Sequence, residues 1–251
     1  PLRKDADGKR REPTESELDT IRNNPDRLVT IRRRLSDISW WMRLLCQPLA
    51  AMANKEEGQP GRFWQGRFRG VRLCDEAAVL ACAAYVDLNP IRAAMAETLE
   101  TSDFTSIQRR IESLPGQHGR PAAAARDRFL APVQIDERRD PLGPVPSELP
   151  CRASDKGFLP MSATQYVQLL DWTARQVAGG KAGATPADMP EVLERLGMRP
   201  TQWCGLIRDF GRIFSLVAGL PSTLKHQRGR RTQRPFHTRR RFRELFATTA
   251  V

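Results

Sequence analysis

The stretch that decides the fold of this chain is GRFWQGRFRGVRLCDEAAVLACAAYVDLNPIR, residues 61–92. Its first part, Arg62–Leu73, alternates basic and apolar side chains, which is the period of a strand. The alternation changes phase across Gly70 and predicts a bulge there, because one extra residue restores the phase. With that bulge, one face of the strand would carry three arginines: Arg67, Arg69 and Arg72.

The second part of the stretch is rich in alanine and predicts a helix. Asp75 is a typical N-cap residue, and we expect the helix to run to Asn89, where Pro90 ends it. Tyr85 and Asn89 have the i, i+4 spacing, so a phenol and an amide oxygen would share one face of the helix. A phenol can attack phosphorus, and an amide oxygen can bind a hard cation. The spacing alone leaves a packing role for Tyr85 open.

Upstream of this stretch, Thr14 and Glu17 have the spacing of a capping box and predict a short helix over 15–23. Apolar residues then recur in steps of three and four, which predicts one continuous helix that Pro48 bends or splits. We expect this stripe to face a core, and the alternative is a seam between the two copies of a homodimer. The stripe consists of Leu28, Ile31, Leu35, Ile38, Met42, Leu45, Leu49 and Met52.

Downstream, residues 91–113 predict two short helices, the second beginning near Asp103. Prolines are frequent from Pro115 to Pro160 and no hydrophobic period is sustained there, which indicates a long connection. A helical turn is expected around Ala122–Phe129 within it.

A small bundle of three helices is predicted beyond this connection. Ser162 and Asp188 are the expected starts of the first two helices, and the third ends before Gly219 and Pro221. The third helix has an apolar face made by Trp203, Leu206, Phe210, Phe214 and Val217. The segment from Lys225 to Arg243 then contains nine basic residues and no acidic one, so it predicts either phosphate contacts or a solvated tail.

The composition points to a polyanionic partner. The formal net charge is +12, which favours nucleic acid first and an anionic membrane surface second. No apolar run is long enough for a membrane span, so we expect no membrane partner. The five cysteines lack the C-x-x-C spacing, which argues against a disulfide framework or a zinc site and predicts a cytoplasmic protein.

Two motifs in the opening stretch resemble those of the REP-associated tyrosine transposases, a branch of the single-tyrosine HUH transposases of bacterial insertion sequences. The first is Trp64–Gln65–Gly66–Arg67–Phe68, which matches a W-Q-x-x-F strand. The second is Tyr85–Val86–Asp87–Leu88–Asn89–Pro90–Ile91–Arg92–Ala93, which matches Y-[IV]-x-x-N-P-[IV]-R-A. The resemblance is strong over residues 28–112 and fainter over 157–220.

This resemblance implies an α+β fold, with a ferredoxin-like sheet of which this chain would hold a mostly helical remnant. It implies that Tyr85 is the catalytic nucleophile, which forms a 5′-phosphotyrosine link to single-stranded DNA with hairpin ends. Asn89 would be one of three ligands of Mg²⁺ or Mn²⁺. Contacts to DNA would come from Arg62, Trp64, Arg67, Arg69, Arg72 and Arg92.

The chain departs from the family pattern at the metal site. The family takes its other two metal ligands from a His–hydrophobic–His motif, whereas the three histidines here are His118, His226 and His237, none of them two residues apart. With one ligand instead of three, metal affinity should collapse and the Tyr85 phenol would stay unactivated. Because the chain begins with Pro1, we interpret it as a transposase that is truncated at its N-terminus.

The sequence thus predicts four regions: a partial catalytic domain over 1–114, a proline-rich linker over 115–157, a helical domain over 158–221 and a basic tail over 222–251. The leading hypothesis is a fragment of a transposase that cleaves and rejoins single-stranded DNA. The alternatives are a catalytically inactive DNA-binding protein, which would stack bases on Trp64 and Phe68, and a transposase remnant without function. We expect this chain, expressed alone, to be poorly soluble or dimeric, because the Arg62–Leu73 strand would be left as a sheet edge.

Overall fold

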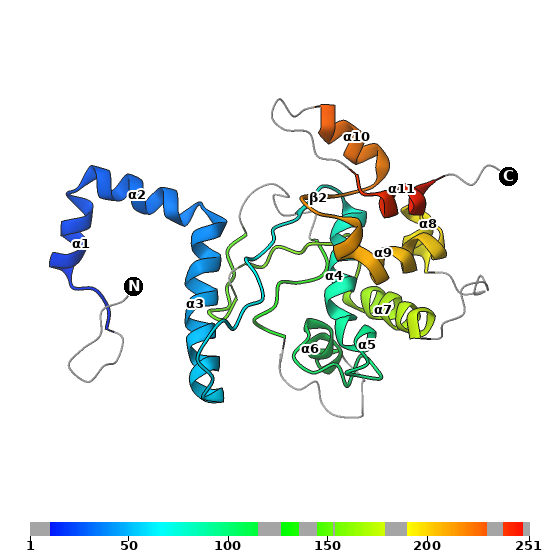
Figure 1. Cartoon of the computed structure of the whole chain (residues 1–251), viewed down its shortest axis with the longest axis horizontal. Coiled ribbons are helices and arrows are strands. Elements are labelled where there is room, and N and C mark those ends of the chain that lie inside the picture. The colour runs from blue at the N-terminus through cyan, green and yellow to red at the C-terminus, as the bar shows by residue number, and fades with distance from the viewer. Residues whose placement is uncertain are drawn as a thin grey trace. The chain divides into compact units, whose positions relative to one another are not determined.

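The computed structural model describes residues 11–114, 127–135, 145–152, 154–178, 190–229 and 238–247. The chain forms two compact units, Pro1–Arg69 and Gly70–Val251, and each is described by itself (Figure 1). The sequence predicts divisions after residues 114, 157 and 221. The observed division falls inside the predicted Arg62–Leu73 strand, because the chain on either side of it contacts different helices.

The described residues of the first unit, 11–69, form three helices, and a side chain caps the start of each one. Helix α1 is Glu15–Arg22, α2 is Pro25–Leu35 and α3 is Ile38–Glu57. The predicted capping box of Thr14 and Glu17 is present at α1. The caps of α2 and α3 are Asn24 and Asp37.

The prediction of a single core-facing helix over this unit was wrong in two respects. The helical stripe is divided between α2 and α3 at Ser36 and Asp37, where the Asp37 carboxylate accepts a hydrogen bond from the Ser39 amide (2.7 Å) and begins a new helix. Pro48 lies inside α3, which continues past it. No residue of α1, α2 or α3 is buried, so the stripe does not face a core within this unit.

The prediction of a strand over Arg62–Leu73 was also wrong. Only Arg72–Leu73 forms a strand, β1, which pairs in parallel with β2, Val217–Ala218. Residues 61–68 instead contact α3, because polar side chains bind backbone carbonyls across that contact: the Asn54 amide binds the Gly61 carbonyl (2.8 Å) and the Trp64 indole binds the Cys46 carbonyl (2.9 Å). The three arginines expected on one strand face therefore do not share one.

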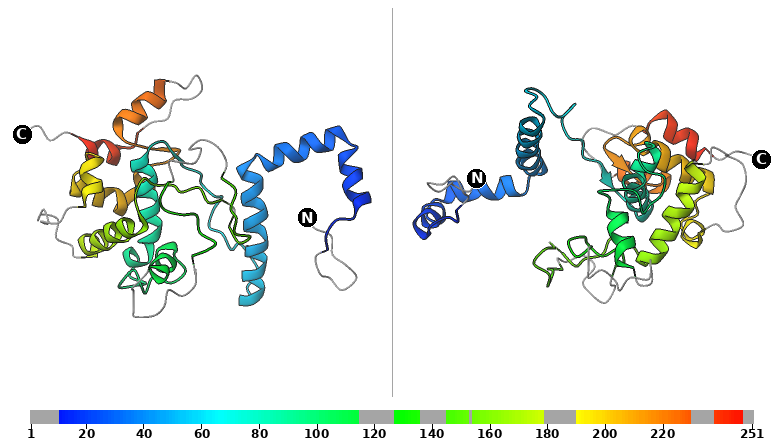
Figure 2. Two further views of the ribbon diagram at one scale, coloured as in Figure 1. Left: turned by 180° about the vertical axis from the view of Figure 1, so that it is seen from behind. Right: turned by 90° about the horizontal axis from the view of Figure 1, so that it is seen from below.

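The second unit is an assembly of helices. They are α4 (Glu76–Asp87), α5 (Asn89–Arg92), α6 (Ser106–Ser113), α7 (Ala163–Ala178), α8 (Glu191–Arg195), α9 (Pro200–Ile213), α10 (Pro221–Gly229) and α11 (Arg240–Phe246). Helix α4 packs against α9, which also contacts α7. Figure 2 shows these helices gathered together in the second unit. The second unit is thus rich in helix, and its described residues form one two-stranded parallel sheet.

The predicted N-cap of α4 is confirmed, since the Asp75 carboxylate accepts a hydrogen bond from the Ala78 amide (2.8 Å). The predicted end was wrong, because α4 stops at Asp87 and Asn89 begins the short helix α5. Pro90 cannot donate a hydrogen bond to the carbonyl four residues before it, which explains the interruption at Leu88. Pro90 therefore lies in the first turn of a new helix rather than after the last turn of the old one.

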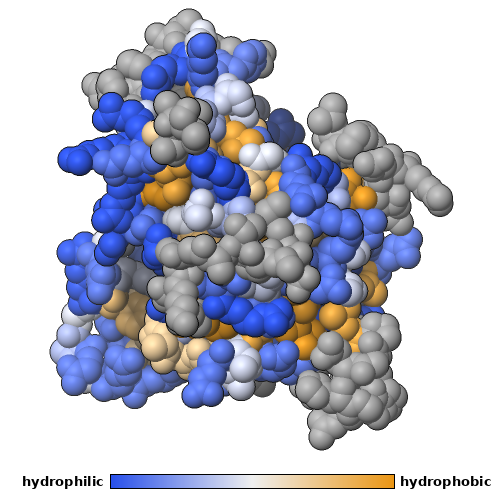
Figure 3. Space-filling model, turned by 90° about the vertical axis from the view of Figure 1, so that its right-hand side faces the viewer, coloured by the Kyte–Doolittle hydropathy of each residue, from blue (hydrophilic) through white to orange (hydrophobic). Residues whose placement is uncertain are grey.

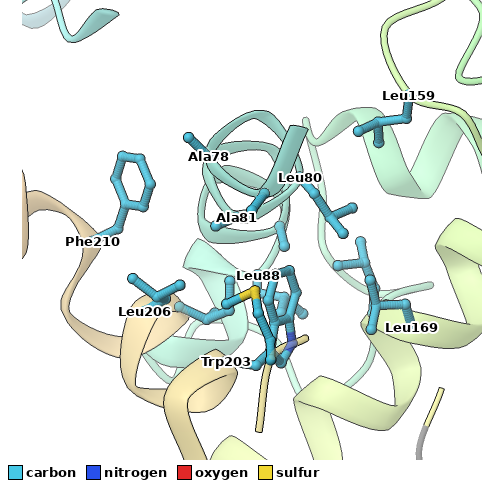
Figure 4. Close-up of a cluster of buried hydrophobic side chains, with 14 of the residues drawn as sticks. Ala78, Leu80, Ala81, Leu88, Leu159, Leu169, Trp203, Leu206 and Phe210 are labelled. Atoms are coloured by element: carbon cyan, nitrogen blue, oxygen red, sulfur yellow. The ribbon is translucent and has the colours of Figure 1, made fainter. Parts of the chain in front are cut away.

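The hydrophobic core is built around α4 (Figure 4). Leu206 and Phe210 approach it from α9, and Leu169 approaches from α7. Trp203, a residue of the predicted apolar face, is fully buried and donates its indole N–H to the Thr173 hydroxyl (2.9 Å). Much of the face of the second unit that Figure 3 shows is hydrophilic, with apolar groups between the polar ones.

The bundle helices agree in part with their predicted bounds. Ser162 caps α7 as expected, with its hydroxyl accepting from the Gln165 amide (3.1 Å). Helix α9 ends at Ile213, earlier than predicted, and Val217 belongs to β2. The predicted start at Asp188 lies outside the described residues.

Two regions predicted as linker and tail contain packed segments. Val133 and Leu159 of the proline-rich region are buried, and Gln134 forms an isolated parallel bridge with Leu159. The tail contributes α10 and α11, and Phe242 of α11 is buried. The turn expected around Ala122–Phe129 is described only from residue 127 onward, where turn structure begins. In the described part of the chain, no helix is both long and apolar enough to span a membrane.

Candidate functional site

Tyr85 lies near the end of α4, in contact with α5 and α9. Its ring contacts two side chains: the tilted Phe210 ring, at 5.5 Å between centroids, and the Arg92 guanidinium, at 4.5 Å from the Tyr85 ring centroid. The hydroxyl faces Gly211, where an added Cβ would lie 3.4 Å from it. The ring is thus partly buried.

Arg92 is the second motif residue at this place. Its Nη2 donates to the Arg208 carbonyl (2.6 Å), which ties α5 to α9. Its Nη1 is buried and has no hydrogen-bond partner within the described ranges. Asp209, next to the accepting carbonyl, has non-helical backbone angles (φ −121°, ψ 17°) and marks a kink in α9.

Asn89 does not share a helix with Tyr85, because the chain leaves α4 at Leu88. The Asn89 side chain is exposed at the start of α5. The resemblance implied a metal ion here, yet the residues at hand do not fit one. No group of three His, Cys, Asp or Glu side chains converges in the part of the chain that the structure describes. His226 is exposed on α10, and His118 and His237 lie outside the described residues.

Asp87 is a buried residue of the motif that sequence reasoning missed. Its carboxylate is 3% exposed and accepts hydrogen bonds from the Tyr166 hydroxyl (2.8 Å), the Ser106 hydroxyl (2.7 Å) and the Ile107 amide (3.3 Å). These bonds join α4 to α6 and α7, and so they hold the end of the helix that carries Tyr85. An acidic residue inside an alanine-rich helix was the available signal, since such a side chain is rarely buried without partners.

The other buried groups near Asp87 have perturbed acidities. Burial raises the pKa of Tyr166 well above its ordinary value, and the negative charge of Asp87 and their hydrogen bond act in the same direction. Burial lowers the pKa of Arg110, although the charge of Asp87 opposes that change. Arg110 donates to the Ala131 carbonyl (2.9 Å), which anchors part of the proline-rich region.

The first unit contains a groove of about 730 Å³ between α3 and residues 64–68. We call it the aromatic groove, and it is lined by Ser39, Trp40, Met42, Arg43, Leu45, Cys46, Leu49, Trp64, Gly66, Arg67 and Phe68. Guanidinium groups stack on its rings, with Arg34 at 4.4 Å and Arg43 at 5.2 Å from the Trp40 ring centroid. Arg67 lies 5.7 Å from the Phe68 ring centroid.

The arginines of the aromatic groove have no carboxylate partner among the described residues. Arg43 contacts Gln47 (3.4 Å), and Arg67 contacts the Ser39 hydroxyl (3.4 Å). Guanidinium groups without a carboxylate partner beside half-buried aromatic rings suit a ligand with both negative charge and flat rings.

The predicted DNA contacts are therefore divided between the two units. Trp64 and Arg67 line the aromatic groove, and Arg62 and Arg69 are exposed residues of the same unit. Arg72 is exposed on β1, and Arg92 lies on Tyr85, both in the second unit. Trp40 and Arg43 were missed as groove residues, because they had been assigned to a helix and only the downstream motif was considered.

Three arginines of the predicted tail bind within the chain. Arg239 donates to the Gly211 and Arg212 carbonyls (3.2 and 2.8 Å), Arg240 pairs with Glu244 (2.6 Å), and Arg241 pairs with Asp209 (2.8 Å). These three residues belong to folded structure, although the Arg240 side chain stays exposed to solvent. The alternative of phosphate contacts stays a prediction.

Comparison with protein-family models, with curated proteins and with solved structures found no match. The fold and the sites define a basic protein of two units, one carrying the aromatic groove and one carrying a tyrosine that contacts an arginine and a phenylalanine.

Proposed function

We propose that this chain acts in DNA transposition as the tyrosine-bearing part of a single-tyrosine transposase. The observation that carries the proposal is the placement of two motif residues: Arg92 stacks on Tyr85, and one of its guanidinium nitrogens has no partner among the described residues. On this proposal, β1 and α4 are remnants of a ferredoxin-like domain, the partner is single-stranded DNA with hairpin ends, and the protein acts in the bacterial cytoplasm.

The reaction would be an exchange of phosphodiester bonds. The Tyr85 oxygen forms a bond to phosphorus while the bond from phosphorus to the 3′ oxygen breaks, which gives a 5′-phosphotyrosine and a free 3′ hydroxyl. The phenol loses one proton and the leaving oxygen gains one, so no external energy source is required. On this proposal Arg92 would bind a non-bridging phosphate oxygen through charge-assisted bonds, which requires its buried Nη1 to become accessible to the DNA.

Magnesium or manganese is the cofactor that the resemblance implies. Asn89 is the one implied ligand present in this chain, and it does not form a metal site with its described neighbours. We therefore derive no step through a metal, and any ligands that complete the site must come from outside the described residues.

Covalent capture of DNA tests the proposal. The chain is incubated with a labelled hairpin oligonucleotide in the presence of Mn²⁺, and we expect a denaturant-resistant adduct that Tyr85→Phe abolishes. Arg109→Gln is a matched control, since Arg109 pairs with Glu112 on α6 away from Tyr85. An adduct that persists in Tyr85→Phe, or its absence from the unmodified chain, would reject the proposed cleavage.

A second candidate function is binding of single-stranded DNA without cleavage. The aromatic groove favours it, because bases stack on aromatic rings and unpaired arginines contact phosphates. Binding would then be strong at low salt and fall steeply as salt rises.

Two of the three tryptophans of the first unit allow a matched test of this second function. Trp64 lines the groove, whereas Trp41 is comparably exposed (56% against 42%) and does not line it; each donates its indole N–H to a backbone carbonyl. We expect Trp64→Ala to weaken binding of an oligothymidine by roughly five- to a hundredfold, from the loss of one stacked base. Trp41→Ala should leave binding unchanged. Equal losses in both variants would show that the groove is not the binding site.

A further inference from the structure

A row of five aromatic rings connects Tyr85 to the C-terminal helix. The centroid distances are 5.5 Å from Tyr85 to Phe210, 5.0 Å from Phe210 to Phe214, 5.7 Å from Phe214 to Phe242 and 4.9 Å from Phe242 to Phe246. We call this row the aromatic ladder. It passes from α4 across α9 to α11, three elements that are far apart in the sequence.

Helix α11 is docked along α9. Leu245 packs onto Gly205, where an added Cβ would lie 2.6 Å from a Leu245 methyl group, so the two helices approach closely. At the other end, Arg239 donates to the Gly211 and Arg212 carbonyls, which lie in the last turn of α9. Phe242, between these two contacts, is 5% exposed.

Asp209 lies at the kink of α9, directly before Phe210 of the aromatic ladder. Three guanidinium groups surround its carboxylate: Arg241 at 2.8 Å, Arg212 at 3.6 Å and Arg208 at 3.8 Å. Arg241 is the closest of the three and the only one that comes from another helix. The residues on both sides of Asp209 contact the candidate site, since the Arg208 carbonyl accepts from Arg92 and the Phe210 ring stacks on Tyr85.

We infer that Asp209 and Arg241 are positioning residues for Tyr85. Their ion pair fixes the α9 kink. The kink in turn determines the positions of the Phe210 ring and of the Arg208 carbonyl that accepts from Arg92. The effect of this ion pair on cleavage rests on the proposed function of Tyr85. Its effect on the position of the Tyr85 ring does not. Neither residue contacts DNA in this account, because both act through α9.

The chain has two tyrosines, and this permits a direct measurement. Labelling the tyrosine ring carbons of the full chain with ¹³C gives two sets of NMR signals, which Tyr85→Phe assigns. Tyr166 is fully buried in the core and serves as an internal reference for the fold. We expect Arg241→Gln and Asp209→Asn to shift and broaden the Tyr85 signal while the Tyr166 signal stays in place.

Arg240→Gln is the matched control, because Arg240 is a neighbouring, exposed arginine whose described ion pair is with Glu244 on the same helix. It should leave both signals unchanged. Arg241→Lys should restore the Tyr85 signal in part, since a lysine keeps the charge opposite Asp209. If the unmodified chain forms the DNA adduct, Arg241→Gln should lower its yield about two- to fivefold, the range that a partly exposed ion pair supplies.

Two results would overturn the inference: an unshifted Tyr85 signal in Arg241→Gln, or equal movement of the Tyr85 and Tyr166 signals, which would mean a change of the whole unit. A chain that forms no adduct yet shows the selective Tyr85 shift would reject the proposed cleavage and leave the positioning established.

Discussion

The two tyrosines of the chain have opposite surroundings. The Tyr166 hydroxyl is buried and donates to the Asp87 carboxylate, whereas the Tyr85 hydroxyl has no hydrogen-bond partner in the described part of the chain. A buried hydroxyl bonded to a charged acceptor contributes more to stability than one that faces a half-open surface. This contrast makes Tyr166 the structural tyrosine and Tyr85 the candidate functional tyrosine.

We expect Tyr166→Phe to lower the free energy of unfolding by about 1.5–3 kcal/mol, the range for a hydrogen bond to a charged group. Tyr85→Phe should change it by no more than about 0.5 kcal/mol. Urea denaturation followed by circular dichroism measures both. Equal effects of the two substitutions would contradict the assignment of Asp87 and Tyr166 as a stabilising pair.

The raised pKa of Tyr166 also predicts a dependence of stability on pH. In the folded chain Tyr166 keeps its proton above pH 10, the ordinary pKa value, while in the unfolded chain it ionises there. The contribution of the protonated Tyr166 phenol to folding stability is therefore complete below pH 10 and is lost as pH rises through the folded pKa.

Between about pH 9 and about pH 11, on either side of the ordinary tyrosine pKa, we expect the unmodified chain to lose more stability than Tyr166→Phe does. Urea midpoints at the two pH values give the difference. Parallel losses in the two proteins would show that the Tyr166 phenol does not titrate differently on folding.

The candidate site was predictable from the sequence only in part. Tyr85 and Arg92 belong to one motif and do come together, but the i, i+4 spacing that seemed to pair Tyr85 with Asn89 is interrupted at Leu88. Phe210 lies far along the chain, and no local pattern joins it to Tyr85. Such a contact depends on how α9 packs against α4, which is a tertiary property.

At the level of elements, local signals were the most reliable. Side-chain caps at Thr14, Asp75 and Ser162 predicted helix starts correctly, because capping requires only a few neighbouring residues. The strand over Arg62–Leu73 failed because alternation of basic and apolar residues also occurs where a segment folds back on a helix. Strand pairing needs a partner, and β1 finds its partner at Val217–Ala218, too distant in sequence to be inferred.

Gly157 allows two segments of the proline-rich region to approach each other closely. A Cβ added there would lie 1.9 Å from the Gln134 carbonyl oxygen, a backbone atom that cannot move aside alone. We expect Gly157→Ala to lower the free energy of unfolding by at least about 2 kcal/mol through this overlap.

Gly229→Ala is the control for that substitution, since an added Cβ at Gly229 meets no atom within 4 Å. It should leave stability unchanged or raise it by up to about 1 kcal/mol, because alanine favours helix. Thermal denaturation of the two variants measures the difference. A Gly157→Ala protein as stable as Gly229→Ala would show that the Gln134–Gly157 approach is not required for folding.

At the level of the whole molecule, the two units should differ in independent stability. Every buried apolar residue of the described chain lies at Ala77 or beyond, and the helices of the first unit bury none. Burial of apolar surface is the main term that offsets the entropy of the ordered chain. We expect residues 70–251 to melt cooperatively on their own and residues 1–69 to lose helix gradually on heating, as measured by circular dichroism. A sharp melt of monomeric 1–69 would contradict this.

The exposed apolar stripe of α3 would become buried if two copies of the chain associated, and this burial would stabilise the first unit. Its large apolar residues include Ile38, Leu45 and Met52, which are 64%, 56% and 58% exposed and have the seven-residue spacing of a helix–helix seam. We expect the full chain to form dimers at micromolar concentration in sedimentation experiments, and Leu45→Glu to return it to monomers. Leu216→Glu is the control, because Leu216 is equally exposed (60%) but lies in the second unit. A dimer that survives Leu45→Glu, or one that Leu216→Glu disrupts, would assign the association to another surface. The apolar stripe of α3 would then need a different kind of partner to bury it.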